Sequence, residues 1–249
     1  MWLNSRAAII LFAALVAVTG PARSEQRIEL SDQLGLKLSI LYDRVARPTA
    51  SVILFVGGDG DLAHETGSFL LRARARFVAA GMSVAVPDTP SDHPGGFGPL
   101  FRTWSAHIQD IATVVAFLKR QAPVPVWAVG TSNGTISAAA AAAYLGPRDI
   151  AGVVLTSSVW LGGLGLVPVE KITQPVLIVH NRSDGCPASQ FVLEGKNLPR
   201  LASASVRELI PVDGGGKGGP RCGTGSPHDF AGIDNKVVPP IIVWIKAHN

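Results

Sequence analysis

The stretch VPVWAVGTSNGTISAAAAAAYLG, residues 124–146, places one serine between two glycines where a strand pattern changes into a helix pattern. The apolar run before Gly130 predicts a buried strand, and the alanine run after Gly134 predicts a helix. A direct strand-to-helix turn leaves little room for side chains next to its central residue, which accounts for the two glycines. We therefore expect Ser132 to project its hydroxyl above the sheet, as G-x-S-x-G turns do.

Ser132 has two possible roles, as a helix cap or as a nucleophile. A serine nucleophile needs a base, and the base needs an orienting acid. Asp184 lies just past the apolar strand pattern that includes VLIVHN, and His228 follows the glycine-rich segment 213–227. The order serine, acid, histidine is the one used with strand-turn-helix nucleophiles. We predict a catalytic triad of Ser132, Asp184 and His228.

The rest of the chain alternates short strand patterns with longer helix patterns. An opening hairpin is expected around SDQLG, and several later strands, such as SVILFV and PVLIVH, are apolar throughout. Continuously apolar strands are typical of parallel sheets covered on both faces. The sequence therefore predicts an α/β fold with a doubly wound, mostly parallel sheet flanked by helices.

The first residues predict export. Residues 1–24 combine Arg6, an apolar run and the small-residue site Ala22-Arg23-Ser24, which is typical of a secretory signal peptide. An uncleaved anchor is the alternative, although the run is shorter than the roughly 20 apolar residues that span a bilayer. Residues 25–249 are then expected to form one domain, in the periplasm or secreted, without stable membrane insertion.

Charge and composition argue against a nucleic-acid partner. The chain has 22 Lys and Arg against 18 Asp and Glu, and removal of residues 1–24 takes away Arg6 and Arg23 but no acid. The mature excess is therefore 20 minus 18, a net charge of +2. No basic run or basic-aromatic stripe is present.

The two cysteines are expected to form a disulfide in an oxidising compartment. Cys186 lies two residues after Asp184, and Cys222 lies six residues before His228, so the bond would tether the two catalytic loops. A zinc site that also uses His180 is the alternative. It lacks the closely spaced ligand pairs typical of zinc proteins, and we expect neither a metal nor another cofactor.

An oxyanion hole requires two backbone N–H donors. We expect one from Asn133, which follows Ser132, and one from Gly58 in the glycine-rich loop after SVILFV, with Asp59 close behind. Too few residues separate VVLTSS from QPVLIV for a large cap domain. Trp160 and Leu161, in that interval, are predicted to contact substrate, although Trp160 also fits a core position.

Together these features resemble the α/β-hydrolase fold superfamily, from about Gln26 to the end of the chain. The segments FVGGDGDL, VHNRSDGCP and CGTGSPHDFAGI are similar to exported bacterial hydrolases of the dienelactone-hydrolase-like group. The resemblance implies hydrolysis of a small-molecule acyl ester through an acyl-enzyme, without a cofactor. Two positions depart from it, because Ser132 replaces the cysteine of true dienelactone hydrolases and Val56-Gly57 replaces a His-Gly pair.

Three function classes remain open on the sequence alone. An exported esterase is the first, and an acyltransferase or peptidase with the same triad is the second. A non-catalytic or zinc-binding envelope protein on the same fold is the third, because a fold does not by itself determine activity.

Overall fold

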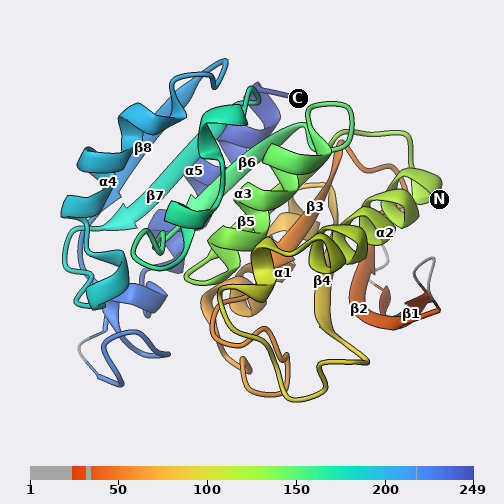
Figure 1. Cartoon of the computed structure of the whole chain (residues 1–249), viewed down its shortest axis with the longest axis horizontal. Helices are drawn as coiled ribbons and strands as arrows, with labels where there is room; N and C mark the ends of the chain where they lie inside the picture. The colour runs from red at the N-terminus through yellow and green to blue at the C-terminus, as the bar shows by residue number, and fades with distance from the viewer. Residues whose placement is uncertain (1–23, 32–34, 217) are drawn as a thin grey trace, which may run out of the picture.

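Eight strands form one sheet in the order β1-β2-β4-β3-β5-β6-β7-β8 (Figure 1). The computed structural model describes residues 24–31, 35–216 and 218–249, so the predicted signal peptide lies outside the described residues except for Ser24. The strands are β1 (Ser24–Ser31), β2 (Lys37–Arg44), β3 (Ala50–Phe55), β4 (Met82–Pro90), β5 (Val126–Thr131), β6 (Gly152–Thr156), β7 (Val176–Asn181) and β8 (Arg207–Val212).

The sheet is mostly parallel. β1 and β2 form the predicted antiparallel hairpin, and β2 also pairs antiparallel with β4. The strands from β4 onward in the sheet order are parallel to one another. The carboxyl ends of β3, β5, β6 and β7 therefore lie at one edge of the sheet, where the loops that carry function gather in such folds.

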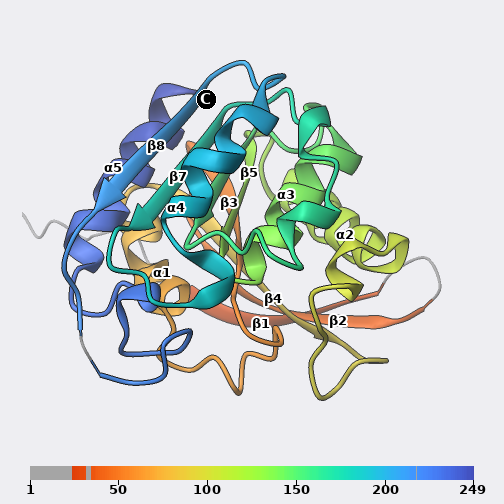
Figure 2. The ribbon, with the colours of Figure 1, turned by 60° about the vertical axis from the view of Figure 1, so that its left-hand side comes forward.

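Helices cover both faces of the sheet (Figure 2). One apolar layer packs against α1 (Phe69–Ala79) and α5 (Asp234–Ala247), and the other packs against α2 (Ser105–Gln121) and α3 (Gly134–Leu145). Strands β3, β5, β6 and β7 are buried along their whole length, which explains their continuously apolar sequences. The predicted fold class is confirmed.

The chain between β6 and β7 carries no cap domain. It contains only two short 3-10 turns, Leu164–Leu166 and Val169–Lys171, as the short interval predicted. A short helix that the sequence patterns did not indicate, α4 (Val192–Asn197), lies between β7 and β8 in the chain. Within the described ranges, no helix is long and apolar enough to cross a membrane.

Candidate active site

The turn at Ser132 connects β5 directly to α3. Ser132 has a φ of 52°, in the left-handed region, which costs a non-glycine residue about 1–2 kcal/mol. The turn is held by hydrogen bonds from Ser132 N to Thr156 O, at 3.0 Å, and from Thr135 N to Ser132 O, at 2.9 Å. The structure thus provides the strained strand-to-helix turn that the sequence predicts at this serine.

The two glycines of the turn are required by close packing. A Cβ on Gly130 would lie 2.7 Å from Thr135 Cα, and a Cβ on Gly134 would lie 2.6 Å from Val56 O. Both distances are far below van der Waals contact, so any side chain at either position would push β5, β3 and α3 apart.

The helix-cap interpretation of Ser132 is not supported. Asn133 occupies the N-cap position of α3, and its side chain makes no capping hydrogen bond. Instead, Asn133 Nδ2 donates to Gly58 O at 2.9 Å. This contact ties the residue after Ser132 to the glycine-rich loop after β3.

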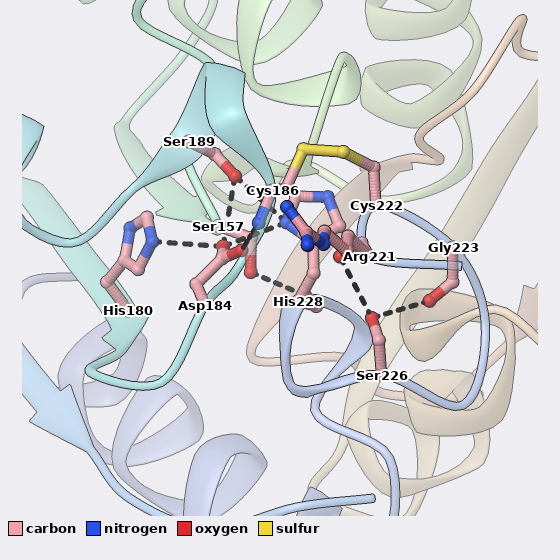
Figure 3. Close-up of a disulfide and its surroundings, with 10 residues drawn as sticks. All are labelled: Ser157, His180, Asp184, Cys186, Ser189, Arg221, Cys222, Gly223, Ser226 and His228. Atoms are coloured by element: carbon pink, nitrogen blue, oxygen red, sulfur yellow. Dashed lines mark hydrogen bonds and ion pairs between the residues drawn. A yellow bond between two sulfur atoms is a disulfide. The ribbon is translucent and has the colours of Figure 1, made fainter. Parts of the chain in front are cut away.

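His228 and Asp184 form a buried pair (Figure 3). His228 Nδ1 donates to Asp184 Oδ2 at 2.8 Å, and the two residues are 3% and 7% exposed. Ser157 Oγ also donates to the backbone oxygen of His228, at 2.6 Å. These contacts fix the orientation of the imidazole and place its proton on Nδ1, which leaves Nε2 free to act as a base.

His228 and Ser132 line the same pocket. His228 Nε2 is buried and has no hydrogen-bond partner in the described part of the chain. No hydrogen bond joins it to Ser132 Oγ among the described residues, and catalytic hydrogen bonds are often long until substrate binds. The structure therefore brings all three predicted triad residues to one site, with the hydrogen bond formed between Asp184 and His228.

The glycine-rich loop, residues 57–60, lies against Ser132. A Cβ on Gly57 would be 3.0 Å from Ser132 Cβ and 3.6 Å from Ser132 Oγ. Within the described ranges, neither Gly58 N nor Asn133 N donates a hydrogen bond to a protein acceptor. Two unused N–H groups next to a serine hydroxyl are the feature that an oxyanion hole requires.

Arg102, which sequence analysis did not single out, holds this loop in place. Its guanidinium donates to Gly57 O at 3.2 Å, to Gly58 O at 3.3 Å, and to Ser137 Oγ of α3 at 2.9 Å. Arg102 is 2% exposed, and burial lowers its pKa to about 10. It remains charged at neutral pH and connects the loop to the helix that begins at the nucleophile turn.

Cys186 and Cys222 form the predicted disulfide, with their Cα atoms 4.7 Å apart (Figure 3). Cys186 N also donates to Asp184 Oδ1 at 2.8 Å, so the crosslink begins beside the carboxylate. Both thiols are used in this bond, which removes them from the alternative zinc site. No group of three or more His, Cys, Asp or Glu in the described residues could hold a metal ion.

Loss of the disulfide is expected to lower the free energy of unfolding by about 4 kcal/mol in the chain-entropy model, because it closes a 36-residue separation. Urea denaturation with and without reductant measures the loss. The Cys186→Ser, Cys222→Ser double variant should match the reduced protein and should not respond to reductant. A loss of less than about 1 kcal/mol in the free energy of unfolding would show that the disulfide does not stabilise the fold as a tether.

Besides His228, two other side chains donate hydrogen bonds to Asp184. His180 Nε2 donates to Asp184 Oδ2 at 3.1 Å, and Ser189 Oγ donates to the same oxygen at 3.0 Å. Burial alone raises the pKa of Asp184, but hydrogen bonds from His180 and His228 outweigh burial and lower the pKa to about 2. The carboxylate is therefore ionised throughout the neutral range, as the orienting acid of a triad must be.

His180 lies between two buried carboxylates. Its Nε2 faces Asp184, and its Nδ1 lies 2.5 Å from Glu194 Oε1, on α4. Trp160 Nε1 donates to the other Glu194 oxygen at 2.8 Å. Burial lowers the pKa of His180, but the hydrogen bonds to Asp184 and Glu194 outweigh it and raise the pKa to about 9.

This raised pKa predicts a pH-dependent stability. Between about pH 6.5 and pH 9 the folded chain keeps a proton on His180 that the unfolded chain releases. The contribution of this proton to the free energy of unfolding is fully present below about pH 6.5. It is lost as the pH rises toward 9, by at most about 1.4 kcal/mol per pH unit. Glu194→Gln removes one of the two carboxylates that raise the pKa of His180, so the decline in stability should end at a lower pH. Urea denaturation at a series of pH values measures this shift.

The matched control is His248→Gln, because His248 lies at the C-terminal end of α5, where its ring packs on Trp244 and its Nδ1 bonds to Trp244 O, with no carboxylate partner among the described residues. That variant should keep the wild-type pH profile. A Glu194→Gln profile that overlays the wild type would show that His180 is not cationic in the folded chain.

The two predicted substrate contacts, Trp160 and Leu161, differ in exposure. Trp160 is 3% exposed, belongs to the hydrophobic core and directs its indole N–H to Glu194. It does not line the pocket that contains Ser132 and His228. Leu161 is 59% exposed and does not line that pocket either, so a contact with substrate at Leu161 stays a prediction.

Comparison with known proteins identifies the fold. No protein-family model matches the sequence, and neither does any curated protein. Among solved structures, esterase Pf2001 of Pyrococcus furiosus superposes with a TM-score of 0.66 at 16% identity, over 91% of this chain and 93% of that one. The chain has the α/β-hydrolase fold.

Two other esterases share this fold. Est1E from Butyrivibrio proteoclasticus superposes with a TM-score of 0.65 at 17% identity, over 89% of this chain and 98% of that one. A cold-adapted esterase from an Arctic intertidal metagenomic library gives 0.67 at 17% identity, over 90% and 93%. At these identities the likeness concerns the fold, and the argument for activity depends on the site itself.

Proposed function

We propose that the protein is a serine hydrolase that cleaves carboxylic esters of small molecules. One observation carries the proposal. Ser132 and His228 line one pocket, Nε2 of His228 has no hydrogen-bond partner among the described residues, and Nδ1 of the same imidazole is bound to Asp184 at 2.8 Å. A hydroxyl on a strained turn, a free basic nitrogen and an ionised orienting acid are the three parts of an acyl-transfer site.

The proposed reaction uses each of these groups in turn. His228 Nε2 takes the proton of Ser132 Oγ while that oxygen attacks the ester carbonyl carbon. The N–H groups of Asn133 and Gly58 stabilise the resulting oxyanion. His228 then gives its proton to the leaving oxygen, the C–O bond breaks, and the alcohol departs from the acyl-enzyme. Water, deprotonated by His228, attacks the acyl group and regenerates Ser132.

The comparisons support an ester as the substrate. The superposing proteins from Pyrococcus and Butyrivibrio are esterases, and Est1E has been solved with ferulic acid bound. Ferulic acid is a small carboxylic acid, the kind of product that ester hydrolysis releases. A small-molecule acyl substrate for this chain is consistent with a site that has no cap domain over it.

We also propose that the protein works outside the cytoplasm, in the periplasm or secreted. The apolar run within residues 1–24 and the disulfide between Cys186 and Cys222 support this location independently. Disulfides persist in oxidising compartments and are rare in the cytosol.

A fluorophosphonate probe tests the proposed nucleophile, because it reacts covalently with activated serines. We expect one probe per chain, mapped by mass spectrometry to the peptide that contains Ser132. Ser132→Ala should remain unlabelled, whereas Ser183→Ala, which removes an exposed serine near Asp184, should label as the wild type does. No labelling of the folded, oxidised protein would refute the serine mechanism.

A further inference from the structure

Two carboxylates, those of Glu65 and Asp229, line the pocket and have no role in the proposed triad. Glu65 lines the pocket together with Ser132 and His228. It is half-buried, and a Cβ built on Gly58 would collide with Glu65 Oε1, so the carboxylate packs directly over the glycine-rich loop. The Glu65 side chain is therefore close to the site where the ester carbonyl must sit.

Glu65 differs from the acids around it because it has no ion-pair partner among the described residues. Asp59 is paired with His64 at 2.8 Å, and Asp229 is paired with Arg72 at 2.7 Å. Arg102 attracts Glu65 electrostatically, but its two terminal guanidinium nitrogens donate to the glycine-rich loop and to α3, and its Nε has no hydrogen-bond partner in the described part of the chain. Burial raises the pKa of Glu65, and the charge of Asp59 adds to this effect. A cation bound next to Glu65 would offset both the burial of its carboxylate and the repulsion from Asp59.

Ser68 supplies an independent sign that this pocket is built for a polar ligand. The side chain lines the same pocket and is 6% exposed, yet its Oγ has no hydrogen-bond partner in the described part of the chain. It precedes α1 but does not cap that helix. A buried hydroxyl without a partner costs about 1–3 kcal/mol, which a bound donor or acceptor would recover.

The position of His228 indicates which part of the substrate enters this pocket. In the proposed mechanism His228 Nε2 protonates the leaving oxygen, so the alcohol must lie next to that nitrogen. The open trough on the other side of Gly58, lined by Asp59, residues 95–98 and Asn133, lacks His228 and is left for the acyl chain. Glu65 and Ser68 are thus placed on the alcohol side.

We propose that Glu65 and Ser68 form a subsite for the leaving alcohol and select alcohols that carry a protonated amine. The preferred substrates are then esters of small amino alcohols. This inference rests on the proposed ester hydrolysis. The carboxylate attracts the positive charge of the ammonium group, and the Ser68 hydroxyl oxygen accepts the hydrogen bond of the ammonium N–H.

A pair of isosteric esters tests the subsite. 2-(Dimethylamino)ethyl acetate is protonated near neutral pH, and 3-methylbutyl acetate has the same shape without the charge. We expect the ratio of their kcat/KM values, cationic over neutral, to fall about tenfold in Glu65→Gln, because a partly buried charge pair is lost. For the cationic ester, the loss should appear mainly as a higher KM. Ser68→Ala should lower kcat/KM for the cationic ester about fivefold, the value of one hydrogen bond.

Glu208→Gln is the matched control, because it removes the same charge from an exposed position on β8. It should leave the ratio as in the wild type. An unchanged ratio in Glu65→Gln, or equal losses on both esters, would overturn the subsite. If both esters are hydrolysed in a Ser132-dependent way while the ratio stays constant, the esterase proposal stands and only the subsite fails. If neither ester is hydrolysed and Ser132 does not react with the fluorophosphonate, both proposals fall.

Discussion

Ser132→Ala is expected to lower kcat for ester hydrolysis by about a millionfold, as loss of the nucleophile does in known serine hydrolases. Alanine keeps the backbone and the Cβ but removes the oxygen that attacks the carbonyl carbon. Residual turnover would come from the N–H groups of Asn133 and Gly58 acting on attack by water. Initial rates with a chromogenic short-chain ester, at enzyme concentrations high enough to detect slow turnover, measure the loss.

Ser157→Ala is the informative control for Ser132→Ala. Ser157 is a serine that also has a positive φ, 48°, and its buried Oγ donates to the backbone oxygen of His228. It should lose at most about tenfold in kcat, because one hydrogen bond to the backbone of His228 is worth about 1 kcal/mol. A Ser132→Ala protein that folds normally and keeps more than about a hundredth of the activity would show that another group is the nucleophile.

Asp184→Asn is expected to lower kcat by about 10⁴-fold, the second largest effect. The asparagine amide would present a donor or a weaker acceptor to His228 Nδ1, so the imidazole would no longer be held with Nε2 free. Steady-state rates across the neutral pH range measure the loss. Asp213→Asn is the control, since Asp213 follows β8 and pairs with Arg182 at 3.4 Å in an exposed position.

The same substitution at Asp184 has a second expected consequence. His180 would keep only Glu194 as a counter-ion for its buried positive charge, which favours loss of its proton. Breaking one side of a buried ion pair costs about 3–5 kcal/mol, so the variant should also unfold at lower urea concentration. Rates should therefore be compared below the unfolding transition of both proteins. A folded Asp184→Asn protein that loses less than tenfold in kcat would remove Asp184 from the triad.

Much of the fold is readable from local sequence because its signals are local. A strand buried on both faces must be apolar at every position, as in SVILFV and PVLIVH, and these segments are β3 and β7. The turn at Ser132 is visible because only glycine fits at Gly130 and Gly134, where a Cβ would meet backbone atoms. The short α4 had no such signal, because six residues do not establish a helical period.

The candidate site divides in the same way. Ser132, Asp184 and His228 could be named because each follows a strand or a glycine-rich loop, and parallel strands bring such positions to one edge. The disulfide could be paired because the chain has only two cysteines. Neither inference required knowledge of a distance between atoms in the folded chain.

Long-range side-chain contacts could not be read from the sequence. The sequence places His180 within an apolar strand pattern, and it places Trp160 after another strand, where a substrate contact is predicted. Both in fact meet Glu194, which lies on a helix that the sequence did not reveal. Glu65 likewise gained its position over Gly58 from the path of the loop that follows β3.

The sequence by itself determined the alternation of the long helices with the strands, the strand-to-helix turn at Ser132, the order of Ser132, Asp184 and His228 along the chain, and the cysteine pair. The tertiary structure alone decided which charges are buried together and that Glu65, at the pocket, has no ion-pair partner among the described residues. The physical reason is that strand periodicity and glycine requirements act over a few residues. The pKa values of His180 and Asp184, in contrast, depend on groups that only the packing of β7, α4 and the loop at His228 brings within hydrogen-bond distance.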